Sequence, residues 1–245
     1  MHNCRFAGKR RPDIIKSVEN PLPLTRELAK IFKWYLGESV RIPFYFFGEA
    51  REILQDSSQD KKYGIHTCFE FNRKEGSDSC ADPESYQTTS YREISRLINY
   101  LRLTQDDVVA DLGCGKGRVV FLMALAGVRK AIGVELRPTL ATIAETNFQK
   151  LPPASSEAII CLQDAARYSF SDETIIFMFN PFGVRTFTQV IANLKQNAKQ
   201  NPRTLRIAYR GPYKNFLDAE DWLEKEGRII ERTSITVWRN KRANL

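Results

Sequence analysis

The chain has 245 residues, of which 42% are hydrophobic and 27% are charged, and its formal net charge is +8. This composition is typical of a folded globular protein and excludes a fibrous or largely disordered chain. No apolar run approaches the roughly 20 residues that a membrane-spanning helix needs, and the N-terminal residues lack the apolar core of a secretory signal. We therefore expect a cytoplasmic protein built as one large domain, or as one domain with an appendage.

Cysteine and histidine usage limits the metal and redox chemistry that the chain can carry. It has five cysteines, none in a CxxC pair, and two histidines, His2 and His66. The cysteines are Cys4, Cys68, Cys80, Cys114 and Cys161. This supply is too poor for a zinc cluster, so we predict no metal site. We expect the cysteines to be free thiols in a reducing compartment.

Residues 1–85 show no regular alternation of strand and helix, and we assign them to a largely helical N-terminal extension. Apolar residues recur at helical spacing between Pro21 and Leu36. We expect the stretch from Leu24 to Phe47 to form a lid or a substrate-shaping appendage that packs on the rest of the protein. An interfacial membrane helix is the alternative, because basic residues flank its apolar face.

From residue 86 the pattern changes, and we predict a second unit over residues 86–245. Ser90 and Glu93 form a capping-box signature at the start of a helix. Buried-strand runs then alternate with helical stretches, which predicts a parallel sheet with helices on both faces. The strands are expected at Asp107–Asp111, Ala131–Glu135, Ala158–Leu162, Thr174–Asn180 and Leu205–Tyr209. The helices are expected at Gly117–Ala126, Pro138–Lys150, Val184–Ala198 and Tyr213–Glu226.

Two further β-like runs, Arg228–Glu231 and Ser234–Arg239, end the chain. They are too close together for a helical crossover, so they can only be joined as an antiparallel pair. We therefore predict an α/β fold with a doubly wound, seven-stranded and mostly parallel sheet that has one antiparallel edge strand.

A glycine-rich loop, Asp111–Gly117, joins the first strand of this sheet to the helix that follows. Glycines let a ligand approach the backbone closely, and the helix N-terminus supplies unpaired N–H groups. A dinucleotide-binding fingerprint would need glycine at position 118, where the chain has Arg118, so a dinucleotide-dependent oxidoreductase is disfavoured. Acids also stand at three successive strand ends, at Asp111, Glu135 and Asp164.

The pattern Asp-x-Gly-x-Gly-x-Gly resembles the first motif of class I S-adenosylmethionine-dependent methyltransferases, and the resemblance covers residues from about 86 to the C-terminus. It implies S-adenosylmethionine as cofactor and S-adenosylhomocysteine as product. The resemblance implies that Asp111 contacts the α-ammonium of the cofactor, and that Gly113, Gly115 and Gly117 let the cofactor approach the backbone. It also implies that Glu135 contacts the ribose hydroxyls and that Asp164 and Ala165 contact the adenine.

The stretch Tyr86–Tyr91 resembles a Tyr-x-x-Thr-x-Tyr segment that folds over the cofactor in similar methyltransferases. The resemblance implies that Tyr86 and Thr88 belong to the cofactor site, with Thr89 as a second candidate for the cofactor carboxylate. The open alternative is that these residues only cap the helix that follows.

The fourth strand runs into Asn180-Pro181-Phe182-Gly183, which resembles the (Asp/Asn)-Pro-Pro-aromatic motif of methyltransferases that act on planar amino or amide nitrogens. Asn180, Pro181 and Phe182 are therefore expected to face the methyl acceptor, with Asn180 beside the cofactor's methyl group. The chain has one proline where that motif has two. This form also resembles bacterial methyltransferases with varied substrates and the non-SET histone-lysine methyltransferases. A simple strand-ending turn is the alternative.

We predict a methyltransferase whose acceptor is an amine or amide nitrogen of a small molecule or a protein side chain. The alternatives are a nucleic-acid methyltransferase, a histone-lysine-like protein methyltransferase and a non-catalytic cofactor-binding module. A hydroxyl acceptor would call for a general base, for which His66, Glu70 and Tyr86 are the candidates. No motif in residues 1–85 names the acceptor.

The positive charge is concentrated at the two ends of the chain. Residues 1–41 hold nine Lys or Arg against four Asp or Glu, and residues 228–245 hold five against one, so the remainder is near neutral. The charge therefore bears on which surface meets a partner, and it does not favour nucleic acid as that partner.

Overall fold

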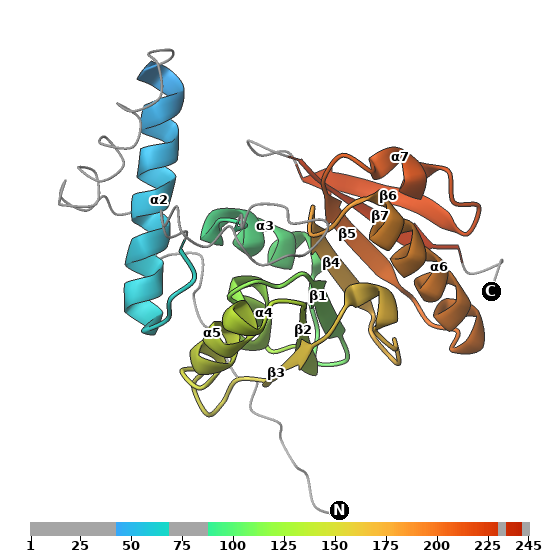
Figure 1. The fold of residues 1–245 in the computed structure, drawn as a ribbon, viewed down its shortest axis with the longest axis horizontal. Helices are drawn as coiled ribbons and strands as arrows, with labels where there is room; N and C mark the ends of the chain where they lie inside the picture. The colour runs from blue at the N-terminus through green and yellow to red at the C-terminus, as the bar shows by residue number, and fades with distance from the viewer. Residues whose placement is uncertain (1–42, 69–87, 230–233, 242–245) are drawn as a thin grey trace, which may run out of the picture.

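The computed structural model of the protein describes residues 43–68, 88–229 and 234–241 (Figure 1). The helix expected between Pro21 and Leu36 lies outside these residues, as do Tyr86 and Glu70. None of the helices in the described part has the length and hydropathy that crossing a bilayer requires. Its cysteines are unbridged, and its acids, cysteines and histidine form no cluster that could hold a metal ion.

A seven-stranded sheet forms the centre of the protein, with the strand order β3-β2-β1-β4-β5-β7-β6. Its strands are β1 Val108–Leu112, β2 Lys130–Glu135, β3 Glu157–Leu162, β4 Ile175–Phe179, β5 Arg206–Arg210, β6 Leu223–Ile229 and β7 Ile235–Asn240. Strands β1 to β5 are parallel, whereas β7 is antiparallel to both of its neighbours, β5 and β6. The predicted doubly wound, mostly parallel sheet is confirmed, and its single reversed strand lies next to the edge strand β6.

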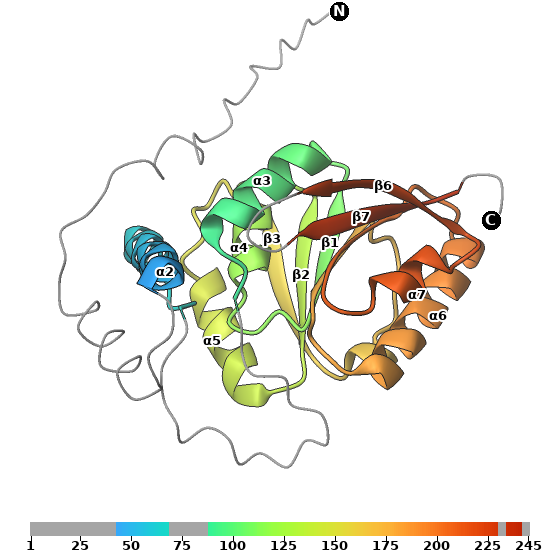
Figure 2. The same ribbon diagram turned by 90° about the horizontal axis from the view of Figure 1, so that it is seen from above.

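Helices cover both faces of this sheet. They are α2 Pro43–Tyr63, α3 Tyr91–Leu101, α4 Arg118–Leu125, α5 Pro138–Phe148, α6 Val184–Gln200 and α7 Lys214–Asp218. Helices α3, α4 and α5 lie on one face, and α6 and α7 on the other (Figure 2). One apolar cluster, which includes Ile94, Leu97 and Phe121, fills the first layer, and a second, which includes Phe187 and Leu194, fills the other.

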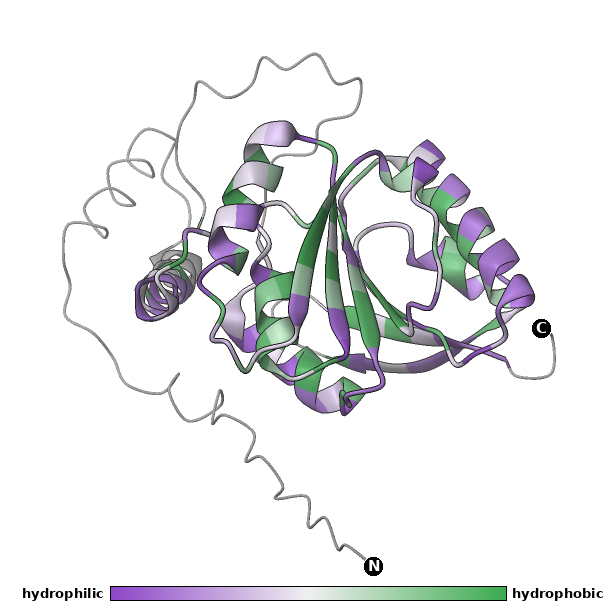
Figure 3. Ribbon diagram, turned by 90° about the horizontal axis from the view of Figure 1, so that it is seen from below, coloured by the Kyte–Doolittle hydropathy of each residue, from purple (hydrophilic) through white to green (hydrophobic). Residues whose placement is uncertain are grey.

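Hydropathy follows this layered arrangement. Figure 3 shows hydrophobic residues along the central strands and hydrophilic residues on the outer side of α6. The parallel strands are apolar on both sides because both faces of the sheet are covered. The bounds of β1 to β5 agree with the sequence prediction to within one residue at each end.

The helix expected at Tyr213–Glu226 is much shorter, which corrects the prediction. Helix α7 ends at Asp218, and residues from Leu223 onward form β6, paired with β7 in the register Leu223–Asn240. Glu and Lys favour helices when only local propensity is counted, and the run 224–226 is rich in them. Pairing along β7 overrides that preference, and the exposed charged side chains suit an edge strand.

Helix α2 lies in the predicted, largely helical N-terminal extension, but its bounds were not predicted. Among residues 51–63 of this helix the buried side chains are polar, namely Asp56, Gln59 and Asp60, whereas Ile53 and Leu54 are only half-buried. A search for apolar periodicity cannot find such a helix. In Figures 1 and 2, α2 stands beside the α3 and α5 side of the sheet.

Candidate active site

The glycine loop lies at the carboxyl end of β1, next to the point where the strand order reverses between β1 and β4. In open α/β sheets, ligands bind outside the carboxyl ends of the strands at such a point. The backbone N–H groups of Gly113 and Cys114 donate to the Val134 carbonyl, which ties the loop to β2. Gly113, Gly115 and Gly117 have φ of +79°, +55° and +81°, so glycine suits each position.

Close packing gives two of these glycines a further role. A Cβ added to Gly113 would lie 2.2 Å from Cβ of Pro181, and one added to Gly117 would lie 2.6 Å from the Phe148 ring. Both distances are far below van der Waals contact. The loop after β4 therefore lies directly against the glycine loop after β1.

Asp111 is a buried carboxyl group without a partner in the described part of the chain. Its side chain sits in β1, is 4% exposed, and makes no hydrogen bond or ion pair with another described residue. Burial raises its pKa well above the usual value, and the nearby Glu135 carboxylate adds to the rise. Because an unpaired buried carboxyl is costly, the position suits a cationic donor that comes from outside the protein.

Glu135 and Asp164 occupy the tips of the next two strands. The Glu135 carboxylate accepts hydrogen bonds from the backbone N–H groups of Gly115 (2.8 Å) and Arg137 (2.9 Å). Each of its oxygens keeps further capacity to accept. The Asp164 carboxylate accepts from the Ala166 N–H (2.9 Å) and caps a short 3-10 helix, Ala165–Arg167. The parallel pairing of β1, β2 and β3 brings all three predicted acids to one edge.

Two leucines at this edge are unusually exposed for large apolar residues. Leu136 follows the Glu135 carboxylate and is 50% exposed, and Leu162 ends β3 and is 56% exposed. They add apolar surface beside the acids, in the way that ligand sites combine apolar walls with a few polar groups. Sequence reasoning missed both, because an isolated leucine carries no motif.

The loop after β4 carries a backbone feature of its own. Asn180 has a φ of +37°, one of two positive values at non-glycine residues in the described chain. Its N–H donates to the Arg210 carbonyl (2.7 Å), while its half-buried side-chain amide makes no hydrogen bond to another described residue. Such backbone outliers gather at functional sites. Pro181 and Phe182 are half-buried, and Phe182 packs against the second apolar cluster.

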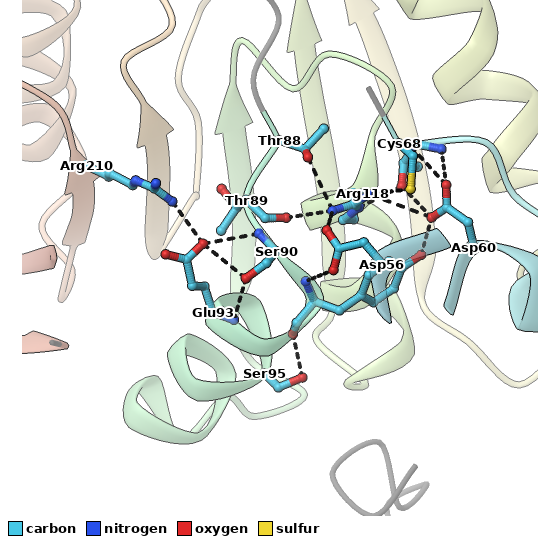
Figure 4. Close-up of polar contacts among 12 residues, drawn as sticks. Asp56, Asp60, Cys68, Thr88, Thr89, Ser90, Glu93, Ser95, Arg118 and Arg210 are labelled. Carbon is cyan, nitrogen blue, oxygen red and sulfur yellow. Dashed lines mark hydrogen bonds and ion pairs between the residues drawn. The ribbon is translucent and has the colours of Figure 1, made fainter. Parts of the chain in front are cut away.

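A buried arginine at the first position of α4 is the main feature that sequence reasoning missed. Arg118 is 3% exposed and contacts residues from α2, from the segment that follows it and from the entry to α3 (Figure 4). Its partners are Asp56, Asp60, Thr67, Cys68, Thr88, Thr89 and the ring of Tyr91. The available signal was an arginine directly after three loop glycines.

Comparisons with known proteins agree with this geometry. A family model described as histone methylation protein DOT1 matches residues 78–155. A protein-lysine N-methyltransferase of Saccharolobus islandicus is 32% identical over 95 residues, which cover 38% of this chain and 58% of that protein. The loop, the three acids and the sheet order agree with these matches, and the chain is similar to class I S-adenosylmethionine-dependent methyltransferases. It spans less than two thirds of the length of that curated relative.

One solved methyltransferase structure of low sequence identity has a similar fold. A precorrin-6y C5,15-methyltransferase from Geobacter metallireducens has a TM-score of 0.50 at 14% identity, over 63% of this chain and 90% of that one. An RNA methyltransferase from Salinibacter ruber, in complex with S-adenosylhomocysteine, has a TM-score of 0.49 at 19% identity, over 63% and 94% of the two chains.

The acceptor groups at this edge of the sheet fit S-adenosylmethionine. S-adenosylmethionine carries an ammonium group, which suits the partnerless Asp111 carboxyl, and two ribose hydroxyls, which suit the remaining acceptor capacity of Glu135. Gly113, Gly115 and Gly117 place no side chain between their own backbone and a ligand. Thr88, the one member of the Tyr86–Thr88 pair that the structure describes, lies beside the start of α4, since its hydroxyl accepts from Arg118 (3.3 Å).

Proposed function

We propose that this protein transfers a methyl group from S-adenosylmethionine to an amine nitrogen, and that the acceptor is the side-chain amine of a protein lysine. One observation carries the proposal. Asp111 lies unpaired on β1, and the loop that starts at Asn180 on the neighbouring strand packs Pro181 onto Gly113. A cation-binding carboxyl and an unpartnered amide are thereby held at the same edge of the sheet.

When bound, the cofactor supplies a methyl group that its sulfonium has already activated. The chain's residues therefore have to bind, orient and exclude water, and they need little covalent chemistry. We propose that Asp111, Gly113, Gly115, Gly117, Glu135, Asp164, Ala165 and Thr88 hold the cofactor. Asn180 would accept a hydrogen bond from the acceptor N–H through its side-chain oxygen, with Pro181 and Phe182 shaping the same side.

The acceptor class rests on two kinds of support. The amide oxygen of Asn180 is an acceptor without charge, which suits an amine that loses its proton to solvent before it attacks. The N–C bond then forms as the C–S bond of the cofactor breaks, and S-adenosylhomocysteine leaves. The curated relative is named a protein-lysine N-methyltransferase, and the matched family model is described by histone methylation. We extend the lysine acceptor from that relative to this chain as a proposal.

The test is a transfer assay with S-adenosylmethionine labelled in its methyl group. The labelled protein, peptide, nucleic-acid and small-molecule fractions of a cell extract are separated, and labelled proteins are hydrolysed to amino acids. We expect labelled methyl-lysine with the wild-type chain, and Asn180→Ala to retain S-adenosylhomocysteine binding while turnover falls about 100-fold. Label in nucleic acid would overturn the lysine acceptor, and cofactor binding without any labelled product would indicate a non-catalytic module.

A further inference from the structure

We propose that Arg118 is a positioning residue for the cofactor site, which holds the segment Thr88–Ser90 against the glycine loop and uses acids of helix α2 as its counter-charges. The inference rests on the proposed function, because it takes the glycine loop to be the cofactor site. The inference includes α2 in that site, although α2 lies within residues 1–85, which the sequence analysis assigned to an N-terminal extension.

The position of Arg118 is electrostatically unfavourable for the helix that it begins. A cation at a helix N-terminus opposes the macrodipole, and a buried guanidinium also loses its hydration. Two carboxylates from one face of α2 offset both costs. The Arg118 guanidinium forms an ion pair with Asp56 and lies 3.8 Å from the Asp60 carboxylate. Arg118 does not stabilise α4 by itself. We therefore attribute its ion pairs to the attachment of α2 to the glycine loop.

One guanidinium joins two chain segments that are distant in the sequence. On one side Arg118 donates to the Thr67 hydroxyl (2.6 Å) and the Cys68 sulfur (3.3 Å). On the other side it donates to the Thr88 hydroxyl (3.3 Å) and the Thr89 carbonyl (3.1 Å). Figure 4 shows Cys68, Thr88 and Thr89 around Arg118. The end of the α2 segment and the entry to α3 thus meet at the first residue after the glycine loop.

Tyr91 and Asp60 close this cluster from the far side. The Tyr91 hydroxyl donates to Asp60 (2.6 Å), its backbone N–H donates to Asp56 (3.2 Å), and its ring lies 4.7 Å from the guanidinium carbon of Arg118. Asp60 also accepts from the backbone N–H groups of Thr67 and Cys68. Because each polar group has a partner, the cluster specifies one orientation of α2.

A second set of bonds connects the α2 segment with the glycine loop itself. The Lys116 ammonium donates to the Cys68 carbonyl (3.3 Å). The Asn147 side-chain amide donates to the Lys116 carbonyl (2.8 Å) and to the His66 carbonyl (3.2 Å), and its oxygen accepts from the His66 N–H. Displacement of residues 66–68 would therefore reach the loop between Gly115 and Gly117.

The entry to α3 is also fixed on its other side, toward the acceptor loop. The Arg210 guanidinium pairs with Glu93 (2.9 Å), which closes the capping box with Ser90 (Figure 4). The Arg210 carbonyl accepts from the N–H of Asn180 (2.7 Å). Residues 88–93 are thus held between the glycine loop and the loop that carries Asn180. Loss of an Arg118 contact would release these residues on the side of the glycine loop, while the Arg210 contacts would still hold the other side.

The experiment compares two variants of the whole chain: Arg118→Lys, which keeps the charge but removes the planar guanidinium, and Asp56→Asn, which keeps the shape but removes the charge. The matched control is Arg129→Lys, which alters an exposed Arg–Asp pair with Asp172 at the opposite end of the strands. Three quantities are measured: the Kd for S-adenosylhomocysteine by calorimetry, the rate of iodoacetamide alkylation of Cys68 by peptide mass spectrometry, and the steady-state constants of methyl transfer.

We expect both variants to weaken S-adenosylhomocysteine binding by about tenfold, the loss typical of one charge-assisted hydrogen bond. The KM for S-adenosylmethionine should rise by a similar factor, with kcat within about twofold. Burial raises the pKa of the Cys68 thiol to about 12, so its alkylation in the wild type should be slow and slower still with S-adenosylhomocysteine. The variants should speed it and reduce that protection, whereas Arg129→Lys should match the wild type.

The outcomes separate this inference from the proposed function. If the wild type fails to bind S-adenosylhomocysteine, the proposed function falls with it. If the wild type binds and the variants bind equally well, Arg118 does not position the cofactor site, even where Cys68 alkylation is faster. A uniform loss of thermal stability with unchanged affinity of the folded protein would also overturn the inference, because it would indicate a structural role alone.

Discussion

Helices α2 and α6 are attached to the same protein by opposite kinds of interface. Helix α6 buries Phe187, Val190 and Leu194 against the sheet, whereas α2 buries Asp56 and Asp60 against one arginine. Apolar burial supplies free energy without directional preference, while a satisfied buried polar cluster contributes little net stability and fixes orientation. The difference indicates that α6 maintains the fold and that α2 positions the site.

The apolar interface should give the largest loss of stability. We expect Phe187→Ala to lower the free energy of unfolding by about 3–5 kcal/mol, because the ring is fully buried between α6 and the sheet. Denaturant unfolding measures the change, and calorimetry at low denaturant checks that the folded fraction binds S-adenosylhomocysteine as the wild type does. A loss of affinity in the folded protein would mean that α6 also shapes the cofactor site.

Asp60→Asn should act locally, with a smaller global effect. Asp60 accepts hydrogen bonds from the backbone N–H groups of Thr67 and Cys68, so an amide in its place should weaken their protection by about tenfold or more. Hydrogen exchange resolved by residue measures this protection. If the global unfolding midpoint fell as far as with Phe187→Ala, the two interfaces would not differ in kind.

Asp111→Asn should raise the stability of the cofactor-free protein at neutral pH. The pKa of Asp111 is raised in the folded state, so its stability contribution is full below the unfolded pKa of about 3.9 and is lost as pH rises through the folded value. An asparagine does not titrate. We expect the variant to be more stable than the wild type at pH 8 and to differ little from it at pH 4; an equal gain at both pH values would contradict the burial argument.

The exposed ion pair between Arg129 and Asp172 should give the smallest effect. Both side chains are half-exposed, and exposed pairs contribute about 0–1 kcal/mol in total. We expect Asp172→Asn to shift the free energy of unfolding by less than about 0.5 kcal/mol, and salt to shrink the difference further. If Asp172→Asn lowered the free energy of unfolding as much as Asp60→Asn does, buried and exposed charges would not differ in their contribution to stability.

The sequence was a good guide where one physical signal dominates. Apolar runs located β1 to β5 to within one residue, since strands buried on both faces carry a strong pattern. The Asp111 and glycine spacing located the loop, because backbone angles and close approach leave few substitutes for glycine. The position of Glu135 was predicted from the same arrangement, because the end of its strand, β2, lies beside the end of β1.

The sequence was a poor guide where polar residues are buried. Nothing in local pattern distinguishes Asp56 and Asp60 from solvated acids, and their burial depends on Arg118, which lies more than 50 residues away. The same limit applies to β6, where Glu224 and Lys225 favour a helix until β7 offers a partner strand. Long-range pairing of charges and strands is a property of the assembled fold.

The most direct test of the central claim is a calorimetric titration of the wild type and Asp111→Ala with S-adenosylhomocysteine, and of the wild type with NAD. We propose that the carboxyl ends of β1 to β4 form an S-adenosylmethionine site in which Asp111 holds the ammonium group. We expect the wild type to bind S-adenosylhomocysteine at one site, Asp111→Ala to bind at least about 100-fold more weakly, and NAD not to bind. NAD binding without S-adenosylhomocysteine binding, or full affinity in Asp111→Ala, would contradict the account.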